Sequence, residues 1–166
     1  MGRLSSLAGL RTTVVAVGRI GSEHCRLLCD DYVALTRRYA QLQVTVVREA
    51  HDRDGAAAKS AEASHLLKAV PAQGSASWTV ALDERGKALT SAAFAAWLAE
   101  RRDRGVRDLC FVVGGSHGLD PSVLKRCDET IRLSDLTLPY KLARVVLLEQ
   151  LYRAITIVLG VPYHKT

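Results

Sequence analysis

Short apolar segments rich in β-branched residues alternate along this chain with longer segments of helical periodicity. The stretch "TTVVAVG" (residues 12–18) is a β-branched run that ends at a glycine, which is typical of a buried strand. Similar strand-like runs cover residues 41–49, 77–83, 107–115 and 129–134. Because helical patterns separate these runs, the sequence predicts an α/β fold with a mostly parallel sheet that is covered on both faces.

The helices predicted between the strands begin at recognisable capping residues. Ser22 is the expected N-cap of the first helix, and Asp120 followed by Pro121 is expected to begin a short helix. The last helix runs from Pro139 towards Gly160, about 22 residues or ~33 Å at 1.5 Å per residue. We predict a loop over residues 50–60, a helix over residues 61–70 that stops before Pro71, and a turn at "ERGK" (residues 84–87).

Composition excludes several classes of protein. A chain of 166 residues with 48% apolar and 24% charged residues is typical of one globular domain. No apolar run approaches the roughly 18 residues that a membrane span needs, and the start has no convincing secretory cleavage site. We therefore expect a cytoplasmic protein without membrane attachment, with residues 1–11 as a flexible extension and residues 12–166 as the domain.

Cysteine usage and net charge give weaker indications. Four cysteines without any CxxC pair predict reduced thiols and no metal site. The formal net charge of +6 favours a polyanionic partner without identifying it.

Three segments follow strands, where ligands bind in open parallel sheets. They are "ALDERGK" (81–87), "GGSHG" (114–118) and "LSDLTLPY" (133–140). Gly114 and Gly115 would let a ligand approach the backbone closely, although a simple strand-to-helix turn explains them equally well. Their spacing fits neither a dinucleotide fingerprint nor a phosphate loop. His117, Asp83 and Glu84 are more simply interpreted as solvated loop residues.

The last predicted helix carries an unusually broad apolar surface, which indicates burial on more than one side or an oligomer interface. Arg144 and Arg153 interrupt this surface, and a half-buried guanidinium needs a partner. Either arginine could pair with Glu149 or with the C-terminal carboxylate. Arg153 could instead face an anionic or electron-rich substrate.

Several of these segments together resemble a known family. The stretches "VAVGRI", "LDERGKALTSAAFA", "FVVGGSHGL", "LSDLTLPYKLARVVLLEQLYRA" and the terminal "PYHK" are similar to the RlmH-type 23S ribosomal RNA methyltransferases. The similarity covers roughly residues 12–166, and the last third is the most specific part. It implies a single-domain, Rossmann-like α/β fold of the SPOUT superfamily whose C-terminal part forms a deep trefoil knot, an arrangement that general topological rules would exclude.

The resemblance also implies an activity. It points to a homodimer that uses S-adenosylmethionine, without a metal, to methylate N3 of a pseudouridine in the subunit-interface stem-loop of 23S ribosomal RNA, within the ribosome or the large subunit. The implied cofactor contacts lie in the same three strand-end segments. They are Leu82, Gly114, Leu133, Ser134, Asp135, Leu136, Thr137 and Leu138.

The chemistry of the acceptor suggests the catalytic residues. The N3 nitrogen must lose a weakly acidic proton, so a cation aimed at a flanking carbonyl would stabilise the imide anion. Arg153 is the candidate for this role, with Tyr163 and His164 closing over the base, from the partner chain of the dimer. Tyr140 stands where the family usually has a histidine ("LPH"), and a tyrosine is a poor base at neutral pH. Tyr140 could contact the base or simply pack, with another group such as His164 as the base.

Two other functions remain open at this point. One is a SPOUT methyltransferase that acts on another RNA, and the second is a catalytically silent dimer that binds RNA or ribosomes. Basic residues near the expected site could contact phosphates, although solvated surface charge is the simpler account of each. These residues are Lys125, Arg126, Arg132 and Lys141.

Overall fold

The fold is a parallel sheet between two layers of helices. A computed structural model describes residue 7, residues 9–51 and residues 54–165. The elements are β1 (Arg11–Val17), α1 (Glu23–Arg37), β2 (Gln41–Val47), α2 (Gly55–Ala69), β3 (Ser77–Ala88), α3 (Ser91–Asp103), β4 (Asp108–Val113), α4 (Pro121–Arg126), β5 (Glu129–Arg132) and α5 (Tyr140–Leu159). The strand order is β2-β1-β4-β3-β5, and every neighbouring pair is parallel. The predicted α/β class is therefore confirmed.

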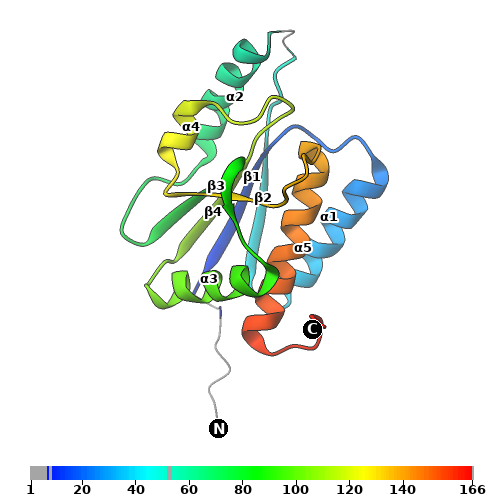
Figure 1. Ribbon diagram of the computed structural model, residues 1–166, viewed down its shortest axis with the longest axis vertical. Helices are drawn as coiled ribbons and strands as arrows, with labels where there is room; N and C mark the ends of the chain where they lie inside the picture. Colours follow the sequence, from blue (N-terminus) through cyan, green and yellow to red (C-terminus); the bar gives the residue numbers. More distant parts are fainter. Residues whose placement is uncertain (1–6, 8, 52–53, 166) are drawn as a thin grey trace.

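Each face of the sheet has its own apolar core. Along β1, Val14 and Ala16 belong to the core under α1, α3 and α5, whereas Val15 and Val17 belong to the core under α2 and α4. Figure 1 shows these two helical layers on either side of the strands. Because both faces are covered, the inner strands β1 and β4 are largely continuous apolar runs instead of alternating ones.

Two boundaries differ from the sequence predictions. Helix α2 begins at Gly55 and not near residue 61, because the Asp54 carboxylate caps it by accepting from the Ala56 amide at 2.9 Å. The strong helix propensity of the following alanines outweighs the polar character that suggested a loop. At the N-terminus, Arg11 already lies in β1, and Leu7 and Leu10 are buried. The domain therefore includes these residues. Gly9 is exposed, and residues 1–6 and 8 lie outside the described residues.

The segment predicted as a turn at residues 84–87 instead continues β3. Two residues of β3, Leu82 and Lys87, both pair with Ile131 of β5, so the register shifts between them. Between these points, Gly86 crosses directly over β5. A Cβ at Gly86 would lie 2.5 Å from the Ile131 carbonyl carbon and 2.8 Å from the Arg132 nitrogen. Only glycine permits two backbones to approach this closely. The trefoil knot itself remains a prediction.

The first residue of β5 is anchored by two side chains from α3. Oε2 of Glu129 accepts hydrogen bonds from Trp97 Nε1 at 2.9 Å and from Arg101 at 3.1 Å. The Arg101 guanidinium also lies over the Trp78 ring of β3, 4.5 Å from its centroid. This contact set fixes the start of β5 between β3 and α3.

Helix α5 is buried on two sides, as its broad apolar surface predicted. It packs against α1 and α3, and its fully buried residues include Leu147, Leu148 and Leu151. Its end is capped by Gly160 in the left-handed conformation, at φ +68°. Within the described ranges, none of the helices combines the length and the apolar character that crossing a bilayer requires. All four cysteines are free thiols.

Candidate active site

A cavity of about 270 Å³ lies between the ends of β3 and β5 and the helices α3 and α5. Leu82 at the end of β3 and Leu133 after β5, both predicted to contact a cofactor, line it. Its other walls come from Leu89, Thr90, Ser91, Phe94, Phe111, Ile131, Arg132, Val146, Leu147 and Gln150. The cavity is therefore mainly apolar, with a few polar groups from α3 and α5, which is a usual composition for a small-molecule site.

The segment 134–138 is an exposed loop beside this cavity and does not line it. Its shape comes from Ser134, whose Oγ accepts from the Leu136 amide at 2.9 Å, and from an ion pair between Asp135 and Arg132 at 2.9 Å. Leu136 is 78% exposed. A leucine presented to solvent beside a mainly apolar cavity is available to contact a ligand.

Gly114 lies in a tight turn, one of the two explanations that the sequence offered for it. A Cβ at this position would lie 2.8 Å from the Gly118 carbonyl carbon and 3.1 Å from a methyl of Leu119. Gly118 has a φ of +78°, and its amide donates to the Gly115 carbonyl at 3.1 Å. The glycine at position 114 is thus required by this tight turn, and the space beside it is filled by the protein itself. Its contact with a cofactor stays a prediction.

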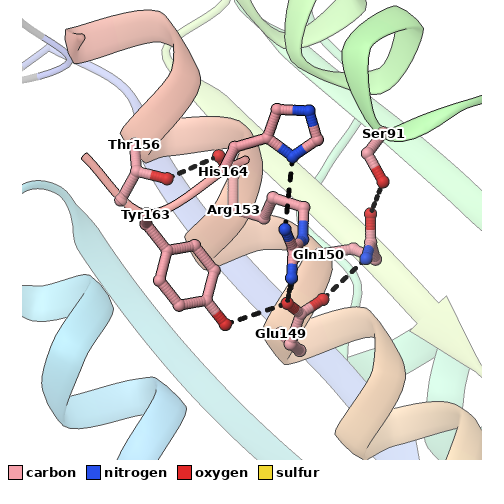
Figure 2. Close-up of polar contacts among 7 residues, drawn as sticks. All are labelled: Ser91, Glu149, Gln150, Arg153, Thr156, Tyr163 and His164. Carbon is pink, nitrogen blue, oxygen red and sulfur yellow. Dashed lines mark hydrogen bonds and ion pairs between the residues drawn. The ribbon is translucent and has the colours of Figure 1, made fainter. Parts of the chain in front are cut away.

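Three of the four predicted catalytic residues lie together near Glu149, which is in the middle of α5 (Figure 2). Nε and Nη2 of Arg153 donate to Oε1 of Glu149 at 3.0 and 2.5 Å, and the Tyr163 hydroxyl donates to the same oxygen at 3.0 Å. Nη1 of Arg153 lies 3.2 Å from Nδ1 of His164. The pairing of Arg153 with Glu149 is one of the three alternatives that the sequence left open.

The electrostatics of this cluster favour a charged arginine and a neutral tyrosine. The hydrogen bond to Glu149 raises the pKa of Arg153. Burial raises the pKa of Tyr163, and its contacts with Tyr32 and Glu149 raise it further. The Arg153 guanidinium also lies over the Tyr163 ring, 4.8 Å from its centroid. The cluster therefore contains a charged guanidinium that is paired with one carboxylate and held in place by it.

Tyr140 lies away from this cluster in the same chain. It begins α5, thirteen residues before Arg153, which is about 20 Å at 1.5 Å per residue. Its hydroxyl donates to Glu49, just after β2, at 2.5 Å. Burial, together with this hydrogen bond and the negative charge of Glu49, raises the pKa of Tyr140 to about 12. A phenol in this state does not act as a base near neutral pH.

Arg144 has a structural role that the sequence did not reveal. It is only 3% exposed, and its Nη2 donates to the carbonyl oxygens of Val17 and Gly18, each at 2.7 Å. Burial lowers the pKa of Arg144. Pairing with Glu149, one of the expected alternatives, is therefore wrong for Arg144, which instead joins α5 to the end of β1. In the sequence, the position of Arg144 on an apolar helix face indicated that it needs a buried partner, but not which one.

The other polar candidates have local partners. Asp83 forms an ion pair with Arg85 at 2.8 Å, and this hydrogen bond lowers the pKa of Asp83. His117 is exposed, and its ring lies beside Gly55. Among the basic residues considered for phosphate contact, Arg126 donates to the Pro71 carbonyl at 2.6 Å, and Lys141 lies over the Tyr140 ring. Within the described part of the chain, no group of three or more acidic, histidine or cysteine residues could hold a metal.

The sequence matches a family model described as a predicted SPOUT methyltransferase, over residues 10–164. The chain belongs to the SPOUT methyltransferase family. The matched region includes all the strands and helices of the fold, together with the cavity and the Glu149 cluster.

Several curated relatives of this SPOUT methyltransferase carry the name ribosomal RNA large subunit methyltransferase H. The protein from Geobacter sp. (strain M21) is 37% identical over 155 residues, which cover 93% of this chain and 99% of its own. That from Anaeromyxobacter dehalogenans is 45% identical over 157 residues, covering 94% and 100%, and that from Geobacter sulfurreducens is 41% identical over 158 residues, covering 93% and 99%. The resemblance to RlmH-type methyltransferases is confirmed.

Proposed function

We propose that this protein uses S-adenosylmethionine to methylate N3 of a pseudouridine in the subunit-interface stem-loop of 23S ribosomal RNA, in the cytoplasm. Membership of the SPOUT methyltransferase family and the name of its relatives support methyl transfer to ribosomal RNA. The observation that carries the proposal is the position of Arg153. Gln150 lines the cavity, and Arg153 lies about one helical turn further along α5, where Glu149 holds it. This position places a fixed cation near a site suited to a small organic cofactor.

The residues of the cavity fit S-adenosylmethionine. Bound there, this cofactor supplies an electrophilic methyl group on a sulfonium. Leu82 and Leu133 offer apolar surfaces for the adenine ring, and Ser91 and Gln150 offer polar groups for the ribose or the amino-acid part. We expect the loop 134–138 to close over it, with the exposed Leu136 making the largest new contact. Gly114 would contribute through its backbone.

Arg153 would act on the RNA base. Loss of the N3 proton leaves an imide anion whose charge is spread over two flanking carbonyl oxygens, and a guanidinium donating to one of them lowers the barrier. Nη1 of Arg153 does not bind Glu149 and lies beside His164. We expect the RNA base to bind on this side of the cluster. His164 is the better candidate for the proton acceptor, because Tyr140 has a pKa of about 12 and already donates to Glu49.

We further propose that the enzyme is a homodimer that acts on the ribosome or its large subunit. Three large leucines on the adjoining helices α1 and α5 are exposed, Leu27 at 47%, Leu28 at 44% and Leu142 at 41%, which supports an interface on these helices. In such a dimer, the Glu149 cluster of one protomer could serve the cavity of its partner. Two copies would also double the formal charge of +6 available to ribosomal RNA.

The experiment that tests this proposal is transfer of labelled methyl from S-adenosylmethionine. Assembled ribosomes, isolated large subunits, protein-free RNA and transfer RNA are offered as acceptors, and the modified nucleoside is identified by mass spectrometry. We expect label on N3 of pseudouridine in the ribosomal samples only. Label on transfer RNA alone would indicate a methyltransferase with another substrate. Cofactor binding without transfer to any acceptor would indicate a silent RNA-binding protein.

A further inference from the structure

A chain of hydrogen bonds connects the cavity to Arg153 (Figure 2). It begins at Ser91, the first residue of α3, whose Oγ donates to Oε1 of Gln150 at 2.7 Å. Nε2 of Gln150 then donates to Oε2 of Glu149 at 2.6 Å, and Oε1 of the same carboxylate receives Arg153 and Tyr163. Because Ser91 and Gln150 both line the cavity, a ligand bound in the cavity would contact one end of this series of hydrogen bonds.

The orientation of the Gln150 amide is determined by its two neighbours. An amide has a donor at one end and an acceptor at the other, whereas an ionised carboxylate only accepts. The amide nitrogen must therefore face Glu149, and its oxygen is left to accept from Ser91. Rotating the amide by half a turn would bring its oxygen against the Glu149 carboxylate. The link consequently has one stable arrangement.

Gln150 is the donor to one of the two carboxylate oxygens of Glu149. Arg153 and Tyr163 both occupy Oε1, and among the described residues only Gln150 donates to Oε2. Without this donor the carboxylate is held through Oε1 alone, and its last torsion, which is broad and soft, is less restricted. The guanidinium of Arg153 would then lose a fixed partner.

We propose that Gln150 is a positioning residue that couples occupancy of the cavity to the orientation of Arg153. A ligand packed against Ser91 and Gln150 immobilises the amide, the amide fixes Glu149, and Glu149 aims the arginine. Arg153 is already paired with Glu149 without a ligand, and a bound methyl donor would hold this arrangement more tightly. This inference rests on the proposed function, and it adds a hydrogen-bonded connection between the cofactor site and Arg153.

Coupling of this kind is reciprocal. If the cofactor changes the affinity of the Arg153 region for the RNA base by some factor, the base changes the affinity for the cofactor by the same factor. We therefore expect RNA binding to tighten cofactor binding in the wild type and to have little effect on it when the link is broken.

Four variants test the link. Gln150→Leu removes both hydrogen bonds at similar volume, and Ser91→Ala removes the hydroxyl, whereas Ser91→Thr keeps it. The matched control is Val146→Ala, one turn earlier on α5, because Val146 also lines the cavity but has no polar group. We expect Gln150→Leu to lower kcat by about tenfold, equal to about 1.4 kcal/mol. Ser91→Ala should lower kcat less and Ser91→Thr should restore it, while Val146→Ala should mainly raise the KM for the cofactor.

Two readouts separate a positioning role from loss of stability. Gln150→Glu should regain activity relative to wild type as the pH falls, because a protonated carboxyl can donate to Glu149 as the amide does. Hydrogen exchange of the amides in residues 161–165 should slow when S-adenosylhomocysteine binds wild type, and should not respond in Gln150→Leu, although the ligand still binds. Circular dichroism confirms that each variant is folded.

The proposal is overturned if Gln150→Leu keeps a kcat within twofold of wild type and the same response of residues 161–165. It is also overturned if Val146→Ala lowers kcat as much as Gln150→Leu does. If wild type binds S-adenosylhomocysteine but methylates no RNA, the proposed function fails, while the exchange experiment still decides whether the link exists.

Discussion

Replacing Gly86 with alanine tests the backbone crossing between β3 and β5. The added Cβ would lie 2.5 to 2.8 Å from three backbone atoms of Ile131 and Arg132, about 1 Å inside the ~3.5–4.0 Å of an ordinary carbon contact. Because backbone cannot rotate away as a side chain can, we expect a cost near the upper end of the ~1–3 kcal/mol typical of overpacking. The alanine also restricts the unfolded chain, which offsets about 0.4–1 kcal/mol.

The expected net loss is about 2 kcal/mol, which corresponds to a decrease in Tm of about 4–8 °C for a chain of this size. Thermal and urea unfolding followed by circular dichroism would measure it. The control is Gly21→Ala, because a Cβ there has no atom within 4 Å and Gly21 is not among the glycines with positive φ. A Gly86→Ala protein that melts within 1 °C of the control would refute the close crossing.

Three other substitutions give separate predictions. Arg153→Ala should lower kcat for methyl transfer by about 10²–10³-fold, the typical cost of removing one group that stabilises developing charge. Its affinity for S-adenosylhomocysteine in calorimetry should stay within a few fold of wild type, and a fully active Arg153→Ala protein would remove Arg153 from the mechanism. Tyr140→Phe should destabilise the protein, because the neutral hydroxyl donates to Glu49. Since folding raises the pKa of Tyr140 from 10.0 to about 12, this stabilisation is complete below pH ~10 and is lost as the pH rises to ~12. Urea unfolding of wild type and Tyr140→Phe at several pH values should show the difference shrinking across that window, and a constant difference would contradict the role of this hydroxyl. Glu129→Gln should lower the free energy of unfolding by about 1.5–3 kcal/mol, because Arg101 loses a charged hydrogen-bond acceptor. Unchanged stability in Glu129→Gln would mean that the anchor at the start of β5 contributes little.

Local signals in the sequence predicted most of the fold. Asp120 and Pro121 begin α4 as expected, with the Asp120 carboxylate accepting from Ser122, and Gly160 ends α5. These features depend on a few neighbouring residues, so a sequence pattern is enough to find them. The ends of the parallel strands likewise pointed to the segments that contain Leu82 and Leu133, because a parallel sheet gathers its strand ends at one edge. The family resemblance then indicated these two residues.

Features that depend on distant pairs were not predictable in the same way. The turn expected at residues 84–87 has the charge and glycine of a real turn, but its glycine is explained by Ile131, which is far along the chain. The bond from Ser91 to Gln150 spans 59 residues, and that from Tyr140 to Glu49 spans 91. Nothing in the local pattern of either partner indicates such contacts. The Arg153 and Glu149 pair was among the alternatives that the sequence offered, and its members lie four residues apart on one helix.

The anchoring of Glu129 has an optical consequence. The chain contains two tryptophans, Trp78 and Trp97, and both lie against Arg101, which together with Trp97 holds the first residue of β5. Indole emission depends strongly on a nearby charge and on hydrogen bonding at the ring nitrogen. The intrinsic fluorescence of the protein should therefore change when β5 docks beside β3 and α3. The rate of this step during refolding can then be measured without any added label.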